Sequence, residues 1–136
     1  LLVKTPEPTS ITDSYSLLKA LNRHSRFSKE YSRIKVIANR VDTEEEGKTL
    51  YNKLNAVVAR YLKLPIDYLG SVPQDSLLSK AVMQQTPVSI QSPTAKSAIA
   101  NERIAAKLMN KEVSRTIPKR GMAAFFSHII SAKKNG

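Results

Sequence analysis

Residue types that perform chemistry in enzymes are sparse in this chain of 136 residues. His24 and His128 are far apart, and neither has a nucleophile with a plausible orienting partner, so we expect surface or packing roles for both. The run Glu44–Glu46 has three carboxylates, but consecutive residues do not share a helix face, which disfavours a metal site. The chain has no cysteine, so disulfides and thiolate chemistry are excluded.

Glycine-rich loops that bind phosphate are also absent. Neither GxxxxGK[ST] nor GxGxxG occurs in the sequence. The sequence therefore predicts that this chain has no phosphate-cradling loop of its own. Its opening residues, Leu1–Val3, have the character of a strand already under way, and we expect the natural protein to have further residues before them.

Apolar spacing predicts an α/β fold with a parallel sheet, because strand and helix patterns alternate along the chain. Strands are expected at three apolar runs: 1–5, 34–39 and 66–72. Helices are expected to follow four N-cap signals: Ser10 (with Asp13 at the spacing of a capping box), Asp42 or Thr43, Asp75, and Ser92 before Pro93. In such sheets ligands bind beyond the carboxyl ends of the strands.

Three segments at these predicted strand ends carry a resemblance to a known family: Thr5–Asp13 (TPEPTSITD), Ala38–Asp42 (ANRVD) and Leu69–Asp75 (LGSVPQD). In this order they resemble the later motifs of the MinD/ParA family of P-loop ATPases with a deviant Walker A motif. TPEPTSITD is closest to the branch that sets flagellar number and placement, the FlhG/YlxH/FleN branch. The resemblance implies the C-terminal half of a doubly wound α/β domain over residues 1–110, followed by a basic linker and an amphipathic membrane-targeting helix over 111–136.

The resemblance also implies a site for the adenine and ribose of ATP or ADP. Asn39 matches the residue that hydrogen-bonds the adenine edge, for which an amide offers both a donor and an acceptor. Arg40 flanks the base in the family, where a guanidinium can stack on it. Pro73 and Asp75 match the loop that lies over the adenine. From the residues alone, a turn-forming Asn39, a surface charge at Arg40 and a purely capping Asp75 remain open.

In the family, ATP holds two subunits together as a homodimer and hydrolysis releases them. Glu7 matches a residue that reaches the nucleotide of the partner, and Asp13 matches a nearby position on the dimer face. The signature lysine, the Mg²⁺ ligands and the acidic residue that orients water are expected before Leu1. The resemblance therefore implies an ATP hydrolase as the whole protein and an inactive chain when these groups are missing.

The C-terminal segment predicts an amphipathic helix. Met122, Phe125, Phe126, Ile129 and Ile130 recur at helical spacing, and basic residues flank this apolar face, Lys119 and Arg120 before it. From Lys96 onwards there are nine Lys or Arg against two Glu, within a net charge of +11. This pattern favours a peripheral helix on anionic lipids, and the alternative is a terminal helix docked on its own domain.

The resemblance implies a cytoplasmic protein at the inner face of the bacterial plasma membrane. Its expected protein partner is a signal-recognition-type flagellar GTPase or a flagellar transcriptional activator. A ParA-type partitioning ATPase that binds DNA is an alternative, which the apolar stripe of the tail disfavours because DNA contacts need exposed cations. A non-enzymatic basic adaptor for lipid or protein is a second alternative.

Overall fold

A computed structural model describes residues 1–28 and 33–109 of the chain. These residues divide into two compact units, Leu1–Gln74 and Asp75–Gly136, the second described up to Met109. The predicted boundary between a domain at 1–110 and a tail at 111–136 lies where the described residues end, so it stays a prediction. None of the helices in the described ranges is long and apolar enough to cross a membrane.

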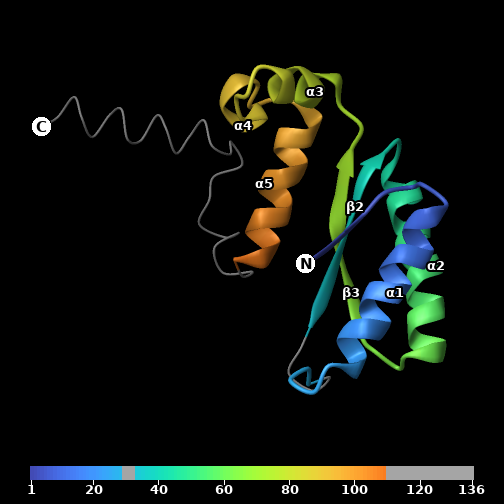
Figure 1. The fold of residues 1–136 in the computed structure, drawn as a ribbon. Helices are drawn as coiled ribbons and strands as arrows, with labels where there is room; N and C mark the ends of the chain where they lie inside the picture. The colour runs from blue at the N-terminus through green and yellow to red at the C-terminus, as the bar shows by residue number, and fades with distance from the viewer. Residues whose placement is uncertain (29–32, 110–136) are drawn as a thin grey trace, which may run out of the picture. The chain divides into compact units, whose positions relative to one another are not determined.

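The first unit is a three-stranded parallel sheet with two helices. The strands are β1 (Leu2–Lys4), β2 (Ile34–Val41) and β3 (Ile66–Pro73), in the order β1-β2-β3. Figure 1 shows α1 (Thr9–Arg23) and α2 (Glu44–Tyr61) side by side on one face of this sheet. Successive crossovers of the same hand to adjacent parallel strands place both helices on that face. The predicted α/β class with a parallel sheet is confirmed.

The core of this unit lies between the sheet and its two helices. Leu54 and Val58 of α2 are fully buried against Val36 of β2 and Leu18 of α1. Their spacing in α2 is that of one helical face, which is the pattern the sequence displays. The buried apolar face of α2 therefore fixes which side of the sheet the helix covers, and with it the position of the β2–α2 turn.

Up to Met109, the second unit contains three helices: α3 (Ser76–Met83), α4 (Val88–Gln91) and α5 (Lys96–Leu108). Its small core consists of Ala81, Val88, Ala95 and Ala98, with Leu78 packed against it. Short side chains at these positions allow the helices to approach one another closely.

Two of the predicted N-caps are wrong. α1 begins at Thr9 after Pro8, without a side-chain cap, and the Ser10 hydroxyl instead accepts a bond from the backbone N–H of Thr5. Asp13 is therefore an exposed residue inside α1 and does not cap it. α5 begins at Lys96, three residues after the predicted Pro93, because the carbonyl of Ser92 closes a turn with the N–H of Ala95.

Lys4 is an unexpected charge in the core of the first unit. It belongs to β1, only 1% of it is exposed, and its Nζ has no hydrogen-bond partner among the described residues. Burial, reinforced by the positive charge of Lys53, lowers its pKa from 10.5 to about 8. The folded state therefore releases this proton at a lower pH than the unfolded chain does.

We predict that Lys4→Met stabilises the fold at pH 7 by about 2 kcal/mol, because it removes a buried, unpaired ammonium while keeping a long side chain. Between pH 8 and 10.5 the unfolded wild type binds more protons than the folded one, so wild-type stability rises with pH. Urea unfolding of both proteins should show that the difference between their free energies of unfolding is smaller at pH 10 than at pH 7. Lys48→Met, at an exposed position, is the control. A gap that does not change with pH would contradict the role given to Lys4.

Candidate functional site

The carboxyl end of β2 is irregular at Arg40. Asn39 pairs with Val72 and Val41 pairs with Pro73, so Arg40 is left out of the ladder at a bulge. Its φ of 59° is in the left-handed region, a backbone conformation that residues other than Gly, Asn and Asp rarely adopt. The side-chain Oδ1 of Asn39 accepts a bond of 3.0 Å from the N–H of Arg40 and supports this conformation. Backbone strain of this kind is concentrated at binding and switch sites.

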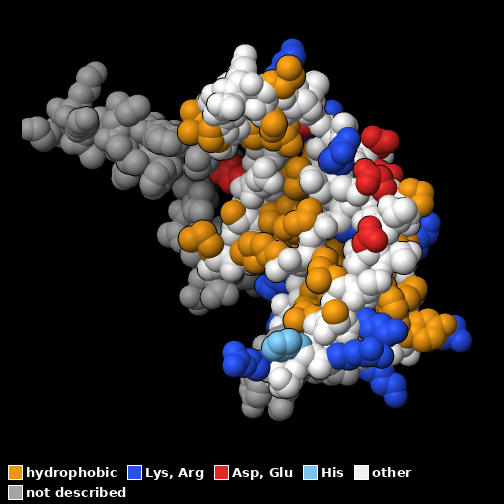
Figure 2. All heavy atoms as spheres, in the orientation of Figure 1, with side chains coloured by type: hydrophobic (Ala, Val, Ile, Leu, Met, Phe, Trp, Pro, Cys, Tyr) orange, Lys and Arg blue, Asp and Glu red, His pale blue; other side chains and the backbone are white. Residues whose placement is uncertain are grey.

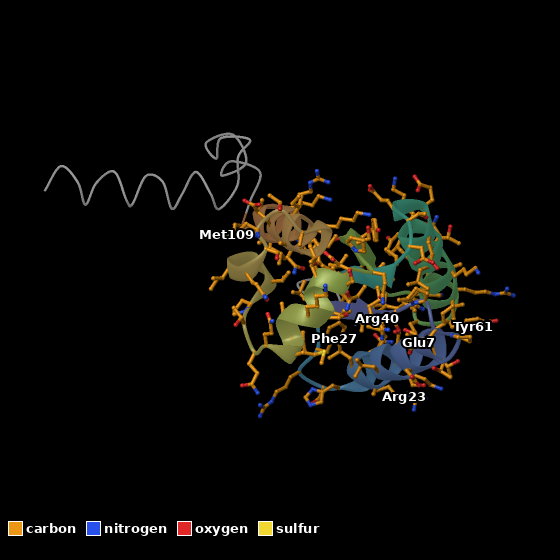
Figure 3. All side chains as sticks on the ribbon, turned by 90° about the horizontal axis from the view of Figure 1, so that it is seen from above. Glu7, Arg23, Phe27, Arg40, Tyr61 and Met109 are labelled. Carbon is orange, nitrogen blue, oxygen red and sulfur yellow. The ribbon has the colours of Figure 1, made fainter. Side chains whose placement is uncertain are left out.

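The Arg40 side chain connects the ends of all three strands. Its Nε donates a 3.3 Å bond to Oε1 of Gln74, which directly follows β3, and the N–H of Gln74 donates to the carbonyl of Val41. Its Nη1 lies 3.9 Å from Oε1 of Glu7, in the loop after β1. Figure 3 shows Glu7 and Arg40 close together at this edge of the sheet. The sequence-predicted residues Glu7, Asn39, Arg40 and Pro73 thus lie along one sheet edge.

The first turn of α2, which follows the same edge, is closed by its own side chains. Oγ1 of Thr43 accepts from the N–H of Glu46, and the Glu46 carboxylate accepts from the N–H of Asp42 at 2.6 Å. Of the two caps predicted for this helix, Asp42 or Thr43, the structure has Thr43. Because these two donors are occupied, the N–H groups of Asp42 and Glu46 are not available to a phosphate.

Charge is separated along the first unit. Figure 2 shows acidic side chains near the beginnings of α1 and α2 and basic side chains gathered at the opposite end, where these helices finish. The acidic residues of the strand-end edge are Glu7, Asp42, Glu44, Glu45 and Glu46. This edge repels phosphate groups and suits a neutral ring that offers hydrogen bonds and a face for stacking.

Asp75 opens the second unit and is engaged by two helices. Its Oδ1 accepts from the N–H of Leu77 at the start of α3, and its Oδ2 accepts from the N–H and hydroxyl of Ser97 at the start of α5. Ser97 is completely buried. These bonds, led by that from the Ser97 N–H, lower the pKa of Asp75. The predicted cap of α3 is confirmed, and the long-range bond to Ser97 takes the place of the local cap expected for α5.

Three residues with a part in this architecture were not among the predicted site residues. Gln74 lies inside the LGSVPQD motif, between Pro73 and Asp75, and this position could have identified it as a site residue. Lys4 is a charged residue within an apolar run of the sequence, and this was a signal for an unusual role. Nothing in the sequence links Ser97 to Asp75. Asp13 makes no bond to the residues described above, and the tail residues from Lys119 to Ile130 lie outside the described ranges. No group of three potential metal ligands occurs in residues 1–28 and 33–109.

Comparison with known proteins identifies two relatives. Over 108 residues the chain is 39% identical to the antiactivator FleN of Pseudomonas aeruginosa, covering 79% of this chain and 37% of FleN. Over 132 residues it is 30% identical to the flagellum site-determining protein YlxH of Helicobacter pylori, covering 95% of this chain and 43% of YlxH. The chain thus spans less than half the length of either relative. No protein-family model matches it.

We predict that Asp75→Asn destabilises the second unit at neutral pH, because an amide cannot accept every bond that the carboxylate accepts from α3 and α5. Since folding lowers the pKa of Asp75, its contribution is present above the ordinary value of 3.8 and is lost as the pH falls through the lowered value. The difference between the urea midpoints of wild type and variant should be larger at pH 7 than at pH 3. Asp13→Asn is the control, and equal midpoints at pH 7 would refute the double cap.

Proposed function

We propose that this chain, which belongs to the FlhG/YlxH/FleN branch of MinD-like flagellar regulators, supplies the base-binding part of an ATP site in a protein that controls flagellar number or placement. The whole protein is an ATPase switch: ATP binding favours a homodimer on the membrane, and hydrolysis returns the subunits to the cytoplasm. The names of the two relatives, an antiactivator and a flagellum site-determining protein, support the flagellar assignment.

The observation that carries the proposal is the Asn39–Arg40 corner at the carboxyl end of β2. Ligands of parallel α/β sheets bind at this edge, and here the ends of the neighbouring strands β2 and β3 hold an amide, a guanidinium and the ring of Pro73. The Asn39 Oδ1 already accepts from the Arg40 N–H, but a carbonyl oxygen has a second lone pair and the amide NH₂ has two donors. Asn39 can therefore still pair with a donor and an acceptor on one edge of a purine.

The acidic charge of the strand-end edge is compatible with a neutral base and unfavourable for a triphosphate. The carboxylates around the start of α2 repel phosphate oxygens, and the N–H groups of Asp42 and Glu46 are bonded within this turn. In the proposal, phosphates and Mg²⁺ are held by residues outside this chain, and the Mg²⁺ neutralises charge on the transferred phosphoryl group. Glu7 lies beside Arg40 at the base site, and because 65% of its side chain is exposed, it is accessible to the nucleotide of a second subunit.

The membrane part of the proposal rests on the sequence of the tail. The apolar stripe Met122, Phe125, Phe126, Ile129 and Ile130 with its basic flanks suits the boundary between headgroups and acyl chains. One such helix binds a bilayer weakly, and two helices on a dimer bind more tightly through effective concentration. ATP-dependent dimerisation would in this way control residence on anionic lipids and presentation to a flagellar GTPase or transcriptional activator.

For the base site we predict that Asn39→Ala in the full-length protein weakens ATP binding about tenfold and reduces the preference for ATP over GTP, because one edge-on hydrogen-bond pair is lost. Calorimetric titration with both nucleotides measures this. Asn52→Ala, at an exposed position on α2, should leave both affinities unchanged. Unchanged affinity and selectivity in the Asn39 variant would remove this residue from the site.

For the tail we predict that replacing Phe125 and Phe126 with Ser abolishes flotation of the full-length protein with anionic liposomes, because the apolar face loses its two largest side chains. Retention on DNA should be nearly unchanged. If the double variant still floats with the liposomes, the apolar face is not the membrane anchor.

A further inference from the structure

The guanidinium of Arg40 is held at two of its three nitrogens. Gln74 accepts from Nε at 3.3 Å, and the carboxylate of Glu7 lies 3.9 Å from Nη1. A guanidinium is planar, so contacts at two different nitrogens restrict rotation of the plane as well as movement of the group. The group is nevertheless accessible, since 59% of the Arg40 side chain is exposed.

The backbone of Gln74 makes this arrangement precise. Its N–H donates a 2.9 Å bond to the carbonyl of Val41, immediately after the bulge that contains Arg40. Gln74 is thereby fixed to β2 by its main chain and contacts Arg40 by its side chain. A residue held this way can set the orientation of the guanidinium without touching a ligand.

We propose that Gln74 is a positioning residue that, with Glu7 of the same chain, orients the Arg40 guanidinium for stacking on a purine base. This inference rests on the proposed function, because it assumes that the base binds at the Asn39–Arg40 corner. It assigns Glu7 a role within its own subunit, in addition to the role across the dimer that the family resemblance implies. In this arrangement the edge of the guanidinium contacts Gln74 and Glu7, and its planar face stacks on the base.

Stacking area distinguishes purines from pyrimidines, so the test is the ratio of ATP to CTP affinity in the full-length protein, measured by titration calorimetry. Both ligands carry the same triphosphate, so a change in local charge affects them alike and cancels in the ratio. Gln74→Ala should reduce the preference for ATP about two- to fivefold, the range expected from the loss of one exposed polar contact. Gln74→Glu and Glu7→Gln keep an acceptor oxygen and should retain most of the preference.

A double-mutant cycle with Arg40→Lys separates positioning from direct contact. The lysine keeps the charge but loses the plane, so it should lower the ratio by itself, and Gln74→Ala should then cause no further change. Gln91→Ala, which removes a glutamine bonded to Gln84 in the second unit, is the matched control. Thermal melts of each variant check that it is folded.

Three outcomes overturn the inference. If the wild type binds neither nucleotide, the proposed function fails and this inference fails with it. If the wild type prefers ATP and Gln74→Ala keeps the full preference, only the positioning role is wrong. If Gln74→Ala still lowers the ratio in the Arg40→Lys background, Gln74 contacts the base itself.

Discussion

The left-handed backbone of Arg40 is the constraint on which the strand-end edge depends. Because Arg40 leaves the β2–β3 ladder, its side chain emerges where β1, β2 and β3 all end, and it contacts segments 33 residues before it and 34 after it. A residue of regular strand geometry would point to one face of the sheet and could not reach both neighbours. Through the bulge, Arg40 therefore links the segments that follow β1 and β3 to the end of β2.

The second unit has an equivalent organising contact in Asp75. One carboxylate takes the place of two helix caps, so the starts of α3 and α5 are held together by a single side chain. This use of both oxygens gives Asp75 a structural role in the second unit. Its predicted part in the loop over the base stays a prediction.

Lys4 destabilises the same architecture, because its ammonium is buried without a hydrogen-bond partner among the described residues. Buried positions of a strand are normally apolar, and the unpaired ammonium of Lys4 opposes folding at neutral pH. No contact among the described residues compensates for it. The stability of the first unit consequently comes from the apolar face that Leu54 and Val58 of α2 bury against the sheet.

The sequence by itself determined the parallel α/β class, the order of the elements in the first unit and the caps at Thr43 and Asp75, since these follow from local periodicity and from side chains that bond within a few residues. It also identified the edge on which Asn39, Arg40 and Pro73 lie. Only the tertiary structure decided the start of α5, the bulge at Arg40 and the roles of Gln74 and Ser97. These depend on bonds between residues 22 and 34 positions apart, which leave no periodic trace in the chain.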